Sequence, residues 1–267
     1  MKRTATIAAA LTCMAVGPAT AWADDNNGHG ANNSCSSLPS QIALQNALKT
    51  AVTDESSGLD MQMWATLVDR DGIVCAVAFS GADRGSQWPG SRVISAQKAN
   101  TANSFSLGDP TASSKFPHGL ALSTANLYSA VQPGGSLFGL QESNPVDTGV
   151  AYKGPSSNFG KANDPMVGEK IGGVNVFGGG LGLYAAPKKI VGAVGVSGDT
   201  SCADHNIAWR VRHILGLDHL SGVGGVSGDP LRPDNIIFDI TGGASAGGFG
   251  HPHCLFDVDP ATLPAVQ

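Results

Sequence analysis

Charged residues are scarce in this chain of 267 residues: only 14% are Asp, Glu, Lys or Arg, and acidic residues outnumber basic ones by 21 to 16. This balance argues against a nucleic-acid partner, because recognition of a phosphate backbone needs a concentration of cations. The chain instead holds 36 glycines and 15 prolines, which indicates much ordered loop rather than long helices.

Motifs of several enzyme classes are also missing. The cysteines form no CxxC or CxxCH pattern, which disfavours a thioredoxin-like redox site and covalent c-type haem. No GxGxxG follows an early strand, as a dinucleotide-binding βαβ unit requires. Ser197 has Asp199 two positions on instead of the glycine of a nucleophile elbow. A triad of Ser197 with Asp204 and His205 is disfavoured as well, because adjacent helical residues point about 100° apart.

The N-terminal 23 residues predict a secretory signal peptide rather than a membrane span. Lys2 and Arg3 precede an apolar stretch, and Ala21-Trp22-Ala23 fits the small-x-small cleavage pattern. We therefore expect a secreted or periplasmic protein without membrane insertion, beginning with a flexible polar leader over residues 24–38. Loss of Lys2 and Arg3 with the signal changes the formal net charge from −5 to about −7.

Four cysteines remain after the signal peptide, namely Cys35, Cys75, Cys202 and Cys254. An even number in an oxidising compartment predicts two disulfides, for which three pairings are possible. We favour Cys35 with Cys75 and Cys202 with Cys254, because chain ends are often joined to the body of a domain.

Sequence patterns predict a mixed α/β domain. Apolar spacing and stop signals indicate helices over about 40–57, 91–106, 119–131 and 203–215. Asp-Gly at 71–72 predicts a hairpin between two β-rich runs in residues 61–81. A second antiparallel pair is expected from 171–184 and 189–197. Residues 107–170 form a long insertion, mostly loop, and 218–267 an irregular tail that wraps the domain.

Three stretches resemble the GlcG/HbpS-like family of haem-binding proteins, which includes the C-terminal domain of PduO. They are WATLVDRDGIVCAVAFSG (64–81), SAQKANTANSF (95–105) and VGAVGVSGDTSCADHNIAW (191–209). The resemblance implies a profilin-like α/β domain over 39–217: an antiparallel sheet of about five strands flanked by helices, often in homo-oligomers. It also implies non-covalent binding of haem or a related tetrapyrrole.

The resemblance suggests some binding residues. Lys98 and Arg92 lie on the helix that matches the family and could hold haem propionates, although solvated charges are an equal alternative. Gly195 and Ser197 lie in the GVSG turn, which could contact a ligand or simply let the strand approach a helix. Asp199 or Thr200 is placed to cap that following helix.

Histidines are the obvious axial donors for haem, and His118 is the strongest candidate because the long insertion re-enters a helix there. His29 lies in the leader, and His205 and His213 are eight residues apart and do not form a close pair. His251-Pro252-His253 resembles a metal pair, but a disulfide would occupy the neighbouring Cys254.

Two alternatives to haem binding stay open. The first is an enzyme that acts on a small organic acid or degrades haem, with residues 107–170 as a lid. The second is a disulfide-stapled module that binds another protein through its long loops.

Overall fold

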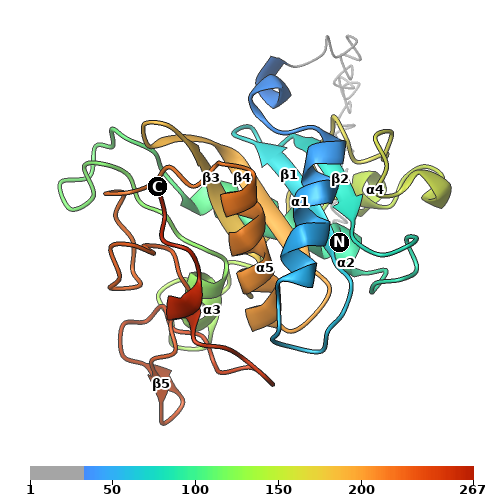
Figure 1. The fold of residues 1–267 in the computed structure, drawn as a ribbon. Coiled ribbons are helices and arrows are strands. Elements are labelled where there is room, and N and C mark those ends of the chain that lie inside the picture. The colour runs from blue at the N-terminus through green and yellow to red at the C-terminus, as the bar shows by residue number, and fades with distance from the viewer. Residues whose placement is uncertain (1–32) are drawn as a thin grey trace, which may run out of the picture. The chain divides into compact units, whose positions relative to one another are not determined.

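The computed structural model describes residues 33–267, so the signal peptide, His29 and most of the leader lie outside the described residues. Figure 1 shows the arrangement of the helices and strands. The strands are β1 (Trp64–Asp69), β2 (Val74–Phe79), β3 (Gly180–Ala185), β4 (Lys189–Ser197), β5 (Ile240–Thr241) and β6 (Ala244–Ser245). The α-helices are α1 (Gln41–Thr53), α2 (Ser91–Phe105), α3 (Tyr128–Val131), α4 (Thr148–Ala151) and α5 (Ser201–Ile214). Short 3-10 turns occupy Asn33–Ser37, Ala125–Leu127, Ser156–Asn158 and Pro260–Thr262.

A four-stranded antiparallel sheet in the order β2-β1-β4-β3 forms the centre of the fold. Side chains alternate across it, as a pleated strand requires. On one face Ala65 and Leu67 pack with α1 and α5, which lie side by side in Figure 1. On the other face Trp64 and Val68 pack with the small-residue stripe of α2. The sheet is therefore enclosed between two layers of helix.

The expected fold class is confirmed, with one correction in the strand count. The predicted hairpin, the helices at α1, α2 and α5, and the β3–β4 pair are all present. The main sheet has four strands rather than about five, and β5 and β6 form a separate ribbon. The strand expected over 171–184 begins only at Gly180, because Gly172, Gly173 and Gly179 have positive φ angles that break the pleat.

The helix predicted over 119–131 is wrong for its first half. Leu120 instead makes bridges to Leu107 and to Gly224, so non-local backbone pairing replaces helical hydrogen bonds. Helical structure starts at Ala125 and ends at Val131. The local pattern of apolar residues could not show the distant strand-like partners.

The favoured disulfide pairing is confirmed. Cys35 bonds Cys75, with 5.5 Å between Cα atoms, and Cys202 bonds Cys254, with 6.0 Å. The second bond fastens the tail to the start of α5, where the tail wraps the domain. Within residues 33–267, no helix is long and apolar enough to cross a membrane.

Candidate functional site

The turn between β4 and α5 is stabilised by its own polar side chains. The Thr200 hydroxyl accepts a hydrogen bond from the Ala203 N–H (3.3 Å) and caps α5. The Asp199 carboxylate accepts hydrogen bonds from the N–H groups of Leu59 (2.8 and 2.9 Å) and Met61 (3.0 Å). Asp199 thus joins the turn to the segment before β1, and of the two cap candidates Thr200 caps the helix.

Asp204, in the first turn of α5, occupies the position where a helix N-terminus favours negative charge. Its Oδ1 accepts hydrogen bonds from the N–H groups of Gly198 (3.0 Å) and Asp199 (2.9 Å). The protein's own carboxylate therefore takes the two donors that a bound anion would otherwise use.

Lys98 forms an ion pair with this carboxylate beneath the turn. Its Nζ lies 2.6 Å from Asp204 Oδ2 and donates to the Val196 carbonyl at 3.1 Å, and the Phe177 ring covers it. Both charged side chains are fully buried. Burial lowers the pKa of Lys98 and raises the pKa of Asp204 to about 6, while the attraction between the two groups opposes both shifts. Lys98 is thus not a solvated charge.

Predicted site residues lie on both sides of the contact between α2 and β4: Lys98 on the helix, and Gly195 and Ser197 on the strand. A Cβ on Gly195 would lie 1.9 Å from the Ser95 carbonyl oxygen, so glycine is required for the two elements to approach. Ser197 is almost fully buried at the end of β4 and pairs with Trp64 of β1. Each of Lys98, Gly195 and Ser197 thus has a structural role of its own, and their role toward a cofactor stays a prediction.

Arg92 lies near the start of α2, on the same helix as Lys98, and joins the insertion to that helix. Its guanidinium makes a bidentate ion pair with Asp164, with Nε 2.9 Å from Oδ2, and donates to the Ala151 carbonyl at 2.8 Å. The guanidinium carbon lies 3.6 Å from the centre of the Phe159 ring. Arg92 is 2% exposed, so the solvated-charge alternative is wrong here too, and its expected contact with a propionate stays a prediction.

The remaining candidate donors are dispersed. His118 is exposed, and its Nδ1 lies 3.3 Å from Asp109. His205 is fully buried and bonds Asn235, whereas His213 pairs with Asp218. None of these contacts joins a histidine to Lys98 or to Arg92.

A serine motif in the tail has a structural explanation. Residues 243–247 read GASAG, which fits the GxSxG pattern of a nucleophile elbow. Ser245 lies on β6 of a two-stranded ribbon, not between a strand and a helix, and its hydroxyl accepts a hydrogen bond from Gly250 N–H (2.9 Å). The ribbon lacks the strand-to-helix turn that exposes such a nucleophile.

An aromatic pocket beside Arg92 was not foreseen from the sequence. We call it the aromatic slot; it has a volume of about 250 Å³ and is lined by Trp64, Arg84, Pro89, Gly90, Tyr152 and Phe159. Trp64 is 1% exposed, and its indole N–H has no hydrogen-bond partner within residues 33–267. A buried donor without a partner among the described residues is costly, and the N–H itself is closed off from solvent.

Only weak signals in the sequence point to this slot. Trp64 begins β1, whereas Tyr152 and Phe159 belong to the insertion, nearly a hundred residues further along the chain. The ion pair of Arg92 with Asp164 brings them together. The unusual length of the insertion was the one available signal, because long ordered loops often carry function.

The slot has several of the groups that a tetrapyrrole needs. Trp64 and Phe159 provide aromatic walls, Arg84 is an exposed cation, and the phenol of Tyr152 is an oxygen donor of the kind that ligates some haems. The volume is below the usual range of about 300–1,000 Å³ for small-molecule pockets. The slot could therefore hold an edge of a planar macrocycle and leave the rest uncovered.

A family model described as haem-degrading protein HbpS-like matches residues 41–212. The chain belongs to the HbpS-like family. Comparison with curated protein sequences found no match.

Three solved structures are similar in part. Protein ORFY of Klebsiella pneumoniae is 24% identical over 66% of this chain and 90% of that chain, with a TM-score of 0.42. A PduOC complex with heme is 20% identical over 65% and 89%, with a TM-score of 0.42. A double mutant of Streptomyces reticuli HbpS is 15% identical over 76% and 99%, with a TM-score of 0.40.

Proposed function

We propose that this HbpS-like protein binds haem or a related tetrapyrrole non-covalently in the aromatic slot. The slot itself carries the proposal: a pocket of about 250 Å³ whose lining joins Trp64, Tyr152 and Phe159 to the cation of Arg84. Family membership supports the choice of ligand, since the family is described by haem degradation.

Four of the slot residues have a part in the proposed complex. The Trp64 and Phe159 rings pack against the macrocycle, and the Arg84 guanidinium pairs with a propionate. The Tyr152 phenol, exposed at the slot, would hold the haem iron. When bound, the haem iron would supply the redox chemistry.

The state of the cysteines supports non-covalent binding. Cys35, Cys75, Cys202 and Cys254 are all held in disulfides, so residues 33–267 offer no thiol for attachment. The same two disulfides, together with the signal-like N-terminus, support a secreted or periplasmic location. A homo-oligomer would cover the part of the macrocycle that the slot leaves open.

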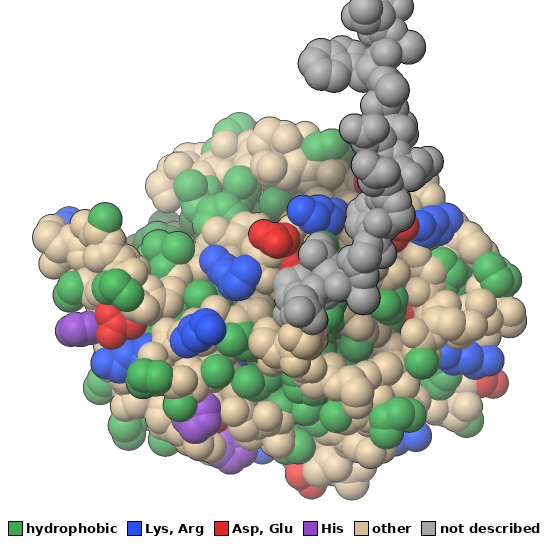
Figure 2. All heavy atoms as spheres, turned by 90° about the horizontal axis from the view of Figure 1, so that it is seen from above, with side chains coloured by type: hydrophobic (Ala, Val, Ile, Leu, Met, Phe, Trp, Pro, Cys, Tyr) green, Lys and Arg blue, Asp and Glu red, His purple; other side chains and the backbone are tan. Residues whose placement is uncertain are grey.

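The basic side chains on one face agree with a small acidic ligand rather than a polyanion. In Figure 2 the Lys and Arg side chains stand singly among polar and apolar atoms on that face. A single cation such as Arg84 suffices for a carboxylate, whereas a nucleic-acid backbone needs many.

Titration of haemin into the purified protein, followed by the Soret band, tests this function. We expect saturable binding that weakens at least tenfold in Arg84→Ala and a changed Soret position in Tyr152→Phe. The matched control is His118→Ala, which removes the exposed histidine outside the slot and should leave both unchanged. Unsaturable absorption would refute haem binding, and saturable binding that only the control variant weakens would refute the slot.

A further inference from the structure

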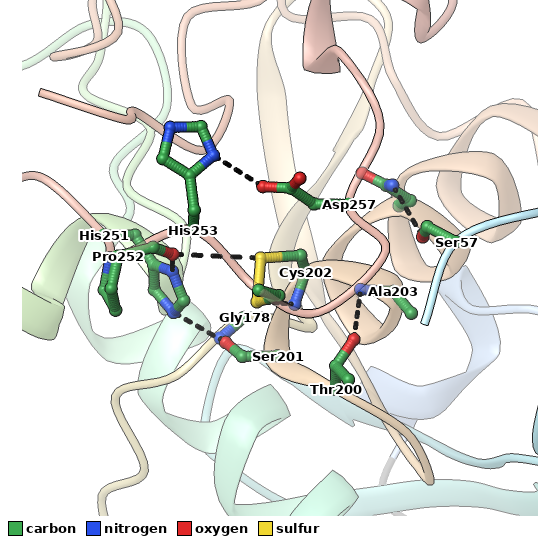
Figure 3. The surroundings of a disulfide bond; sticks show 12 residues. Ser57, Gly178, Thr200, Ser201, Cys202, Ala203, His251, Pro252, His253 and Asp257 are labelled. Atoms are coloured by element: carbon green, nitrogen blue, oxygen red, sulfur yellow. Dashed lines mark hydrogen bonds and ion pairs between the residues drawn. A yellow bond between two sulfur atoms is a disulfide. The ribbon is translucent and has the colours of Figure 1, made fainter. Parts of the chain in front are cut away.

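The start of α5 and the C-terminal tail bring together a set of soft donor atoms. One donor atom each from Cys202, His251 and Cys254 lies within 4.8 Å of the other two. Figure 3 shows the imidazole beside the disulfide, with its ring directed at Ser201. Two sulfurs and one imidazole nitrogen are the donors that zinc prefers.

We propose that reduction of the Cys202–Cys254 disulfide creates a zinc site from Cys202, Cys254 and His251. The aromatic slot plays no part in this site, so it is independent of haem binding. Zinc–sulfur bonds of about 2.3 Å place two thiolates on one tetrahedral ion roughly 3.8 Å apart. The Cα atoms of the two cysteines are 6.0 Å apart, so side-chain rotation alone can open the sulfurs to that separation.

Contacts other than the disulfide hold the three ligands in place. The His251 N–H donates to the Ile237 carbonyl at 2.7 Å. The Ser129 N–H and hydroxyl both donate to the Gly250 carbonyl, at 3.2 and 2.6 Å. Cys202 is fixed by α5 itself. Reduction therefore leaves the donors close together, which lowers the entropic cost of binding a metal.

The surroundings also favour a thiolate and a correctly oriented imidazole. The Cys202 N–H, in the first turn of α5, already donates to Cys254 Sγ at 3.2 Å, and a helix N-terminus stabilises thiolates. His251 has Nδ1 2.6 Å from the Pro252 carbonyl and Nε2 2.7 Å from the Ser201 hydroxyl. One nitrogen can keep its partner while the other binds the metal, an arrangement common in zinc sites.

The redox step needs an external reductant, for which we name a trialkylphosphine. The phosphine attacks the partly exposed Cys254 sulfur rather than buried Cys202, and the S–S bond breaks. Water gives its oxygen to the phosphine, which becomes the phosphine oxide, and its two protons to the sulfurs. Each thiol then loses its proton when it binds zinc. Water completes the fourth coordination position.

Titration with Co²⁺, a spectroscopic substitute for Zn²⁺, tests the site in the purified protein with and without a trialkylphosphine. We expect sulfur-to-cobalt charge-transfer absorption that saturates at one ion per chain, appears only after reduction and is displaced by Zn²⁺. Cys35→Ser/Cys75→Ser, which removes the other disulfide, should retain the signal. Cys202→Ser/Cys254→Ser should abolish it.

The histidine is tested with a matched pair of variants, both checked for native circular dichroism. His251→Ala should weaken Zn²⁺ binding at least tenfold, whereas His253→Ala, two residues away and exposed, should not. The proposal is overturned by equal binding in the oxidised protein, by no binding after reduction, or by a signal that depends on Cys35 and Cys75. If His251→Ala does not fold, the two double-cysteine variants decide the matter.

Discussion

At the scale of single residues, His205 makes stability depend on pH. Its ring is fully buried, and burial lowers its pKa from 6.5 to about 4. Four neighbouring groups modify this shift of the pKa: Asn235, Asp234, Arg212 and His251. Below pH 6.5 His205 is protonated in the unfolded chain, whereas in the folded protein it stays neutral down to about pH 4. Stability is thus fully retained above pH 6.5 and falls as the pH drops through that window.

We expect His205→Gln to remove this part of the acid sensitivity. Between pH 7.5 and 4, the free energy of unfolding of the natural protein should fall by about 3 kcal/mol more than that of the variant. Urea unfolding at both pH values measures it. Asp204, whose pKa of about 6 gives the opposite slope, is present in both proteins and cancels. His118→Gln is the exposed control, and a parallel pH dependence in all three proteins would contradict the prediction.

At the scale of elements, the contact of α2 with β4 depends on Gly195. A Cβ there would lie 1.9 Å from the Ser95 carbonyl oxygen and 2.5 Å from the Ala99 nitrogen, both backbone atoms of α2. Gly195→Ala must therefore move the helix off the sheet. We expect a loss of more than about 2 kcal/mol in the free energy of unfolding, measured with urea.

Gly90→Ala is the matched control for this change. Gly90 precedes the same helix with a φ of −64°, and an added Cβ there would meet no atom within 4 Å. The variant should unfold within about 0.5 kcal/mol of the natural protein. Equal stability of the two variants would show that α2 tolerates a shift, and the steric account of the GVSG turn would fail.

Elements defined by local pattern were predictable, and those defined by distant contacts were not. The stripe of small residues identified α2, and Asp-Gly identified the β1–β2 hairpin. Leu120 was misread because its backbone partners, Leu107 and Gly224, are far away in the sequence. The contact of Lys98 with a propionate stays a prediction, and its buried partner Asp204 could not be foreseen because the two lie more than a hundred residues apart. The aromatic slot escaped prediction because the ion pair that assembles it is also non-local.

At the scale of the whole molecule, the tail is part of the fold although the family match ends at residue 212. Asp234 pairs with Arg212, and both side chains are fully buried. The Trp209 indole N–H donates to the Pro264 carbonyl at 2.9 Å, and Leu263 belongs to the main core. A chain that ends at Leu217 would leave a buried guanidinium without its carboxylate, a change that costs about 3–5 kcal/mol by itself.

We expect this truncated chain to lose cooperative unfolding, because that cost, added to the lost core contacts, is comparable with the whole stability of about 5–15 kcal/mol for a domain. Thermal unfolding followed by near-ultraviolet circular dichroism measures it. The full-length Cys202→Ser/Cys254→Ser variant separates the effect of the tail's disulfide from the effect of its buried contacts. It loses the covalent link but keeps the Asp234 and Leu263 contacts, so it should lose only about 2–4 kcal/mol and still unfold cooperatively. If instead the truncated chain unfolds like this variant, the disulfide alone accounts for the tail's contribution, and the buried contacts of residues 218–267 stabilise nothing further.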